Sequence, residues 1–305
     1  MKKLTIVWIV FCLLLITGCG ASGEQSNKPS NRTNEDQQTA PSGAEAPTGD
    51  KRIVATTVAI TEIMDALEID LVGIPSSYKE LPNRYENALE VGNPMGPDME
   101  LLLSLKPTEI LSVTTLEYDL KELFAERGIE TTYLNFTSVA SMLKEISKLG
   151  VKHDRTKQAD AIVQSFEEKL VQIQQQVADK PSPKVLILLG IPGSYLVGTE
   201  HSYIGDLVKR AGGTNVISGE TIEFLASNTE YLQQSNPDII LRAAHGMPDE
   251  VVKMFDEEFR ANDIWKHFSA VQQGRVYDLE ETLFGTTGNL AAIDALDELV
   301  EMLYP

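Results

Sequence analysis

Residues 154–178 read DRTKQADAIVQSFEEKLVQIQQQVA, a run with neither glycine nor proline. Its apolar side chains recur at helical spacing, at Ala159, Ile162, Val163, Phe166, Leu170, Ile173 and Val177. We expect Asp154 to cap a helix of about 37 Å, and Pro181 and Pro183 follow its end. A buried core helix is one interpretation. The position of the run, midway along the chain, favours a bridge between two lobes.

Short apolar segments alternate with helical patterns on both sides of this run. We expect strands at 52–55, 71–74, 109–113, 184–189 and 238–241. Nearly continuous apolar strands are typical of buried parallel sheets, and alternation with helices indicates an α/β fold. The predicted architecture is two α/β lobes with central sheets, at 51–152 and 181–305. One long α-helix at 153–180 bridges them.

The two halves share a local pattern. Glu100 stands seven residues before Pro107, and Glu230 stands seven residues before Pro237. In each half a helix is expected to end at the proline, and a strand is expected to begin just after it. This pattern is common in α/β proteins and is weak support when taken alone.

The N-terminus carries the features of a secretory signal. Lys2 and Lys3 precede an apolar run at 4–16 that is too short to span a bilayer. The following ITGC, ending at Cys19, resembles the lipobox of bacterial lipoproteins, with isoleucine where leucine is more usual. The resemblance implies a diacylglycerol on the Cys19 thiol and a lipid anchor at the extracellular face of the cell membrane. An ordinary secreted protein is the alternative.

Residues 1–18 are therefore a predicted signal peptide, and residues 19–50 are the lipidated cysteine and a linker. The linker is rich in Gly, Ser, Asn, Gln, Thr and Pro, so it is expected to be disordered. A flexible coil of this length would hold the folded part roughly 30 Å from its anchor. Cys12 lies in the signal, so the mature chain has no second cysteine for a disulfide.

Charge and motifs exclude several classes of function. Removal of the signal peptide takes the formal net charge from −19 to −21, which disfavours nucleic acid and anionic lipid surfaces as partners. The four histidines are scattered, and none lies between residues 52 and 151, which argues against a zinc or manganese receptor. Nucleophile-elbow, P-loop, zinc-protease and dinucleotide motifs are absent, so we do not expect an enzyme.

Several short motifs together resemble the iron-siderophore, haem and cobalamin receptors of ATP-binding-cassette (ABC) importers. These motifs are KP at 106–107, SYIGDLV at 202–208, AGGTNV at 211–216, NPDII at 236–240 and VQQGRVY at 271–277. The resemblance extends over residues 52–304. It implies a ligand cleft between the lobes, a monomer, and a permease with its ATPase as partners in a Gram-positive bacterium. It also implies that Glu100 and Glu230 dock onto that permease; a solvated helical face is the alternative.

Three further segments resemble the haem-receptor lipoproteins of the iron-regulated surface determinant system. They are PSSYKELPNRY at 75–85, VGNPMGP at 91–97 and RAAHGM at 242–247. This resemblance implies one haem b per chain, taken from the medium or from surface donor proteins, with Met95 and His245 as the axial iron ligands. Imidazole and thioether together fill both axial positions of haem iron. A siderophore already saturates iron with hard oxygen ligands and needs neither residue, so haem is favoured over a ferric siderophore or cobalamin.

The loops that carry these ligands follow from local signals. His245 comes four residues after an expected strand, and open α/β sheets bind ligands beyond the carboxyl ends of their strands. Pro97 and Pro248 are each expected at the first position of a helix. Met247 is a rival sulfur ligand on the same loop as His245.

The remaining candidates are weaker. Tyr195 and His201 are second-choice ligands near the cleft. Tyr78, Lys79 and Arg84 are candidate donors to the haem propionates, although a plain surface loop explains them almost as well. His153 and His267 are interpreted as structural.

Overall fold

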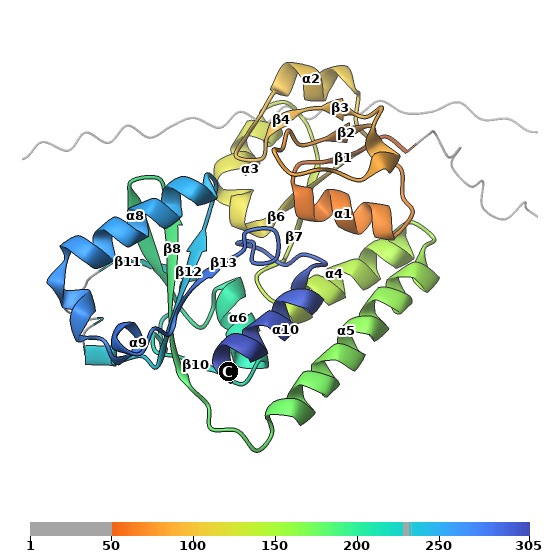
Figure 1. Cartoon of the computed structure of the whole chain (residues 1–305). Helices are drawn as coiled ribbons and strands as arrows, with labels where there is room; N and C mark the ends of the chain where they lie inside the picture. The colour runs from red at the N-terminus through yellow and green to blue at the C-terminus, as the bar shows by residue number, and fades with distance from the viewer. Residues whose placement is uncertain (1–50, 228–231, 233) are drawn as a thin grey trace, which may run out of the picture. The chain divides into compact units, whose positions relative to one another are not determined.

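The computed structural model describes residues 51–305, apart from 228–231 and 233. The described residues all belong to one compact unit (Figure 1). The predicted signal peptide, Cys19, the linker and Glu230 lie outside the described residues. Among the residues that the structure describes, no helix is both long and apolar enough to cross a lipid bilayer.

The N-terminal lobe is built on a parallel five-stranded sheet in the order β3-β2-β1-β6-β7. Its strands are β1 (Ile53–Ala55), β2 (Gly73–Ile74), β3 (Leu89–Glu90), β6 (Glu109–Val113) and β7 (Thr131–Leu134). Side chains of β1 alternate between the two faces, Ile53 and Ala55 on one and Val54 on the other, and all are buried. Burial on both faces explains the continuous apolar runs.

Helices cover both faces of this sheet. They are α1 (Val58–Ala66), α2 (Met99–Ser104), α3 (Glu117–Ala125) and α4 (Val139–Lys152), with 3₁₀ turns η1 (Asn83–Tyr85) and η2 (Thr114–Leu116). Ile60 and Ile63 of α1 are fully buried on the face that contains Ile53, as their spacing predicts. Leu102 of α2 and Leu120 of α3 pack on the opposite face.

The C-terminal lobe holds a six-stranded sheet in the order β11-β9-β8-β12-β13, with β10 also paired to β8. Its strands are β8 (Lys184–Ile191), β9 (Ser194–Gly198), β10 (Thr214–Asn215), β11 (Phe224–Ala226), β12 (Ile239–Ala244) and β13 (Val276–Leu279). The two strands predicted here, β8 and β12, pair in parallel as expected, whereas β9 and β11, which were not predicted, run antiparallel to their neighbours. A two-residue turn at Pro192 and Gly193, with Gly193 at φ 83°, reverses the chain between β8 and β9.

Two layers of helices cover this sheet as well. One layer is α6 (Tyr203–Arg210) and α10 (Ala292–Leu303); the other is α8 (Pro248–Ala261), η3 (Asp263–His267) and α9 (Ser269–Gln272). Leu186 and Leu188 of β8 pack toward α8, whereas Ile187 and Leu189 pack toward α6 and α10.

The predicted long helix is α5 (Thr156–Val177), which has 22 residues and is therefore about 33 Å long. It packs on α4 of the N-terminal lobe and on α6 and α10 of the C-terminal lobe, so it lies across both (Figure 1). The expected cap was wrong. Asp154 adopts φ 57° in the tight turn after α4, and Arg155 occupies the cap position without a side-chain hydrogen bond.

One of the hydrophobic clusters extends through both lobes. It joins Ile53 and Ile146 of the first to Val185 and Leu299 of the second, with Phe166 of α5 between them in sequence. Polar contacts also cross from lobe to lobe. The Gly288 amide donates to the Phe136 carbonyl at 2.7 Å, and the Val139 amide donates to Asp206 Oδ2 at 2.8 Å. The two lobes are therefore fused along one side.

Candidate functional site

His245 lies at the carboxyl end of β12, an inner strand of the sheet in the C-terminal lobe. Strand β12 continues to Ala244, which pairs with Gly190, so His245 follows the strand directly rather than by four residues. Its backbone N–H donates to the Gly190 carbonyl at 2.9 Å. Its side chain is exposed. The backbone that carries the imidazole is therefore hydrogen-bonded to the neighbouring strand β8.

The next two residues complete what we name the 245–247 loop. Gly246 has φ 73° and Met247 has φ 49°, and α8 begins at Pro248 as predicted. The Gly246 N–H donates to Glu281 Oε1 at 3.0 Å. Met247, the rival ligand, is 52% exposed.

Met95 lies at the tip of a small hairpin. Strands β4 (Gly92–Asn93) and β5 (Gly96–Pro97) pair in antiparallel fashion, and Pro94 and Met95 form the turn between them. The Met95 amide donates to Asn93 Oδ1 at 2.9 Å. The Met95 side chain is 64% exposed. A methionine that fills a core would be buried, so Met95 presents its sulfur to the surface instead.

The helix that follows begins later than expected. Pro97 lies in β5 rather than at the first helical position, because Asp98 caps α2 by accepting from the amides of Glu100 and Leu101. Glu100 is exposed in the first turn of α2. Its predicted counterpart, Glu230, lies outside the described residues.

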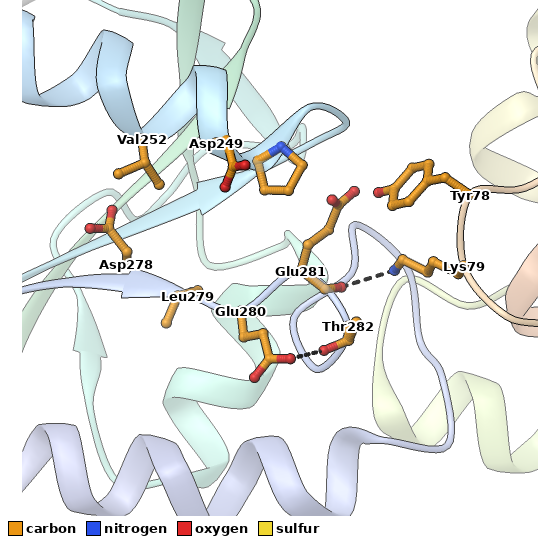
Figure 2. Close-up of a pocket in the computed structure, with 10 residues that line it drawn as sticks. Tyr78, Lys79, Asp249, Val252, Asp278, Leu279, Glu280, Glu281 and Thr282 are labelled. Carbon is orange, nitrogen blue, oxygen red and sulfur yellow. Dashed lines mark hydrogen bonds between the residues drawn. The ribbon is translucent and has the colours of Figure 1, made fainter.

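A pocket of about 380 Å³ lies between the lobes, beside the 245–247 loop, and we name it the interlobe pocket. It is lined by Tyr78, Lys79, Pro248, Asp249, Val252, Asp278, Leu279, Glu280, Glu281 and Thr282. Figure 2 shows Tyr78 and Lys79 reaching from one lobe toward Glu281 of the other. Lys79 Nζ donates to the Glu281 carbonyl at 3.0 Å. Lys79 is the one basic residue of a lining that otherwise carries four carboxylates.

The environment of Tyr78 favours the neutral phenol. Its hydroxyl and the Glu281 carboxylate point toward each other in Figure 2. Partial burial, together with the negative charge of Glu281, raises the pKa of Tyr78 well above its ordinary value. Tyr78 therefore remains a hydrogen-bond donor at physiological pH.

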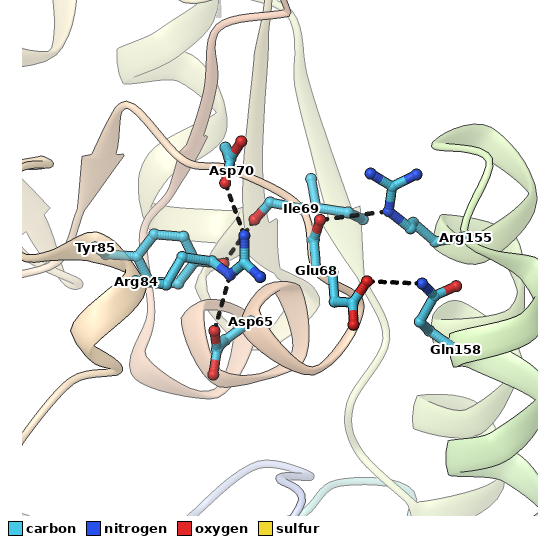
Figure 3. A network of polar contacts seen from close by, with 8 residues as sticks. All are labelled: Asp65, Glu68, Ile69, Asp70, Arg84, Tyr85, Arg155 and Gln158. Atoms are coloured by element: carbon cyan, nitrogen blue, oxygen red, sulfur yellow. Dashed lines mark hydrogen bonds and ion pairs between the residues drawn. The ribbon is translucent and has the colours of Figure 1, made fainter.

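Arg84 does not reach this pocket. Its Nε lies 3.1 Å from Asp65 Oδ1 and its Nη1 lies 2.9 Å from Asp70 Oδ1, as Figure 3 shows. The adjacent Tyr85 hydroxyl donates to the Ile69 carbonyl at 2.7 Å. Arg84 therefore braces the end of α1 against the chain that follows it, and two carboxylates already neutralise its charge.

Tyr195 and His201 do not line the interlobe pocket either. The Tyr195 ring lies 5.8 Å from that of Phe255 and 6.3 Å from that of Trp265, within an aromatic cluster under α8. His201 directly precedes Ser202, the N-cap of α6, and its amide donates to the Thr199 hydroxyl.

The other two histidines differ in burial. His153 is buried at the end of α4, with Nε2 3.5 Å from Glu109 Oε2. Burial alone would raise the pKa of Glu109, but the nearby His153 imidazole and the hydrogen bond from Lys152 outweigh it and hold that pKa below its usual range. His267 is exposed in η3. Within the described residues, no three His, Cys, Asp or Glu side chains converge as a metal ion would need.

Two residues near the site were not singled out from the sequence. Arg242, three residues before His245, is only 8% exposed. It forms ion pairs with Asp278 of β13 and Asp256 of α8. An arginine inside an otherwise apolar strand is a signal that could have been followed. Glu281 is the second residue, and no local pattern marks it.

Comparisons with known proteins place the chain in a family of binding proteins. A family model described as periplasmic binding protein matches residues 53–283. The high-affinity haem uptake system protein IsdE of Staphylococcus aureus (strain Newman) is 44% identical over 304 residues, which are 99% of this chain and 97% of the relative.

Two solved structures match the folded part of the chain. The crystal structure of Staphylococcus aureus IsdE complexed with haem has a TM-score of 0.82 and 48% identity, covering 84% of this chain and 100% of that chain. A substrate-binding protein of an ABC transporter from Listeria monocytogenes EGD-e has a TM-score of 0.80 and 60% identity, covering 84% and 99%. Because these chains are matched almost whole and residues 48–305 form a separate compact unit, we expect that part of this chain to fold without its N-terminal segment.

Proposed function

Because the chain belongs to the periplasmic binding protein family, we propose that it is a receptor that captures haem for uptake by an ABC importer. The observation that carries the proposal is the near full-length similarity to a haem uptake protein whose haem complex has the same fold. The role is capture and delivery of a cargo, and we assign no catalytic step to the chain.

We assign the iron to Met95 and His245. Both side chains are exposed, each backbone amide is hydrogen-bonded, and the two residues come from different lobes. A neutral imidazole nitrogen and a thioether sulfur on opposite faces form a six-coordinate haem and leave no position for oxygen. That arrangement suits a carrier that must not activate oxygen during transfer.

The pocket lining suggests how the haem is oriented. Its four carboxylates, Asp249, Asp278, Glu280 and Glu281, would repel the haem propionates. Lys79 and the neutral Tyr78 are the side-chain donors that the N-terminal lobe contributes to this lining, where both lie next to Glu281. We therefore place the propionates on the side of the N-terminal lobe, and Arg84 takes no part.

The cellular setting is also part of the proposal. The ITGC motif supports a lipid anchor on Cys19 at the extracellular face of the membrane. The receptor is a monomer that docks on a permease through exposed Glu100 and through Glu230, and a partner ATPase drives release. Surface proteins or the medium supply the haem.

The test is a haem titration of residues 48–305, followed by absorbance, on wild type, Met95→Ala and His245→Ala. We expect a one-to-one endpoint with a six-coordinate low-spin spectrum, which either substitution converts to a five-coordinate form or abolishes. His267→Ala, at an exposed histidine far along the chain, is the matched control. A Met247→Ala variant separates the rival sulfur, since its spectrum should match wild type.

Open-ended, weak binding that no substitution changes would refute the haem assignment. Ferric siderophores and cobalamin would then be the ligands to titrate. If haem binding is lost in Met247→Ala but kept in Met95→Ala, the proposed function still holds and Met247 becomes the sulfur ligand.

A further inference from the structure

The 245–247 loop has an uncommon backbone. Gly246 and Met247 both have positive φ, at 73° and 49°. A residue with a side chain seldom adopts this left-handed region, so contacts from outside the loop must hold Met247 there. Main-chain bonds secure the two ends, from the His245 amide to Gly190 and from the Val251 amide to Met247.

The middle of the loop is held by a distant side chain. Glu281 lies 35 residues along the chain from Gly246, and its Oε1 accepts from the Gly246 N–H at 3.0 Å. A carboxylate that accepts from a backbone amide makes a charge-assisted bond, stronger than one between neutral groups. Glu281 therefore stabilises the left-handed conformation of Gly246, the residue directly after His245.

Glu281 is also connected to the other lobe. Lys79 Nζ donates to its carbonyl at 3.0 Å, and the Tyr78 hydroxyl points toward its carboxylate (Figure 2). Its second oxygen, Oε2, is shielded from solvent and has no hydrogen-bond partner among the described residues. Burying an unpaired carboxylate oxygen is unfavourable. Glu281 therefore contacts both the 245–247 loop and the residues that reach across from the other lobe.

We infer that Glu281 is the positioning residue for His245. Its carboxylate holds the Gly246 amide, and its main chain is tied to Lys79, so the imidazole is fixed relative to the lobe that carries Met95. The inference rests on the proposed function for its ligand, but its first consequence concerns the ligand-free protein.

A purely electrostatic role predicts the opposite sign. Glu281 adds a negative charge to a pocket that receives an anionic ligand, so its removal would tighten binding if charge alone mattered. A positioning role predicts weaker binding on removal of the acceptor. Glu281→Gln separates the two, because its amide oxygen can still accept from Gly246 while the charge is gone.

The first measurement is hydrogen exchange at the Gly246 amide in ligand-free residues 48–305. Glu281→Ala should raise the exchange rate about tenfold or more, as expected for loss of a charge-assisted bond. Glu281→Gln should stay near wild type. Glu122→Ala is the control, because Glu122 is an exposed glutamate of α3 that does not line the interlobe pocket. Thermal unfolding checks that all variants fold.

The second measurement is haem dissociation and absorbance of the same variants. Glu281→Ala should release haem about tenfold faster, with part of the six-coordinate signal lost, and Glu281→Gln should restore the wild-type spectrum. Unchanged exchange and spectrum in Glu281→Ala, or tighter haem binding in both variants, would overturn the inference. If wild type binds no haem, the proposed function falls, while the exchange result still decides whether Glu281 holds the loop.

Discussion

Arg242 offers a stability test of the scaffold beneath the site. It donates from Nε to Asp278 Oδ1 at 2.7 Å and from Nη1 to Asp256 Oδ1 at 3.0 Å, which joins β12 to β13 and α8. Its guanidinium carbon lies 5.6 Å from the centre of the Phe255 ring and 5.3 Å from that of Phe259. Arg242→Ala removes all of these contacts at once.

The expected loss follows from the burial of the three charges. Breaking a buried ion pair on one side costs about 3–5 kcal/mol. The Arg242 side chain is 8% exposed, but those of Asp278 and Asp256 are 39% and 64% exposed, so both acids can regain water. The lower end of that range, about 3 kcal/mol, therefore applies. For a domain of this size it corresponds to a fall in Tm of about 6–12 °C.

Thermal unfolding of residues 48–305, followed by circular dichroism, measures the change. Arg260→Ala is the control, since Arg260 pairs with Glu257 and both side chains are exposed, at 78% and 75%. That pair should contribute less than about 1 kcal/mol. If Arg242→Ala melts as close to wild type as Arg260→Ala does, the argument that a buried arginine fastens these elements is refuted.

Three other substitutions test separate features. Gly150→Ala should lower the free energy of unfolding by about 1–3 kcal/mol, because a Cβ there would lie 2.4 Å from the Ala159 Cβ; a gain, the usual helical effect, would contradict the close packing of α4 on α5. Glu109→Gln should be destabilised most at neutral pH, and its deficit in urea unfolding should shrink as pH falls below about 4.5. The deficit shrinks because a carboxyl with a lowered pKa stabilises the fold only while it is ionised, and this contribution is lost when the carboxyl is protonated. A deficit that grows on acidification would contradict this assignment of Glu109. Glu100→Ala should leave haem affinity unchanged yet abolish cellular haem uptake, whereas Glu122→Ala, an exposed glutamate of α3, should affect neither; continued uptake in Glu100→Ala would remove that residue from the docking surface.

Long apolar runs and helical spacing were reliable guides to this fold. The strand expected at 109–113 is β6, and the long helix begins two residues after the expected cap and ends at Val177. Both signals arise from burial, which the sequence records directly as apolar side chains at a fixed period. The lobes and the bridge could therefore be predicted.

Turns were harder to predict, although the sequence contained a signal for one of them. Pro192 and Gly193 form the two-residue turn that makes β9 antiparallel, and that pair is a known turn signal. The prediction for Pro97 was wrong. Proline is compatible with the first position of a helix, but Pro97 belongs instead to β5, a strand of the hairpin that carries Met95. Only the pairing with Gly92 decides between these two uses.

The site itself stays a prediction. Met95 and His245 were assigned from a resemblance carried by short motifs, and the structure places both side chains at exposed turns. Glu281 could not be found in this way, since it meets Gly246 across 35 residues and Lys79 across 202. Such contacts exist only once both lobes have folded.

The core shared by the two lobes limits how a cargo can leave. Exposing one large buried apolar side chain costs about 1.5–3 kcal/mol, and a whole protein is held together by only about 5–15 kcal/mol. Prising the lobes apart far enough to uncover residues such as Phe136 and Met142 would therefore resemble unfolding. If Met95 and His245 hold the cargo as proposed, their exposed turns can shift without uncovering the interior. On that proposal, a transporter would displace two turns and would not open a hinge.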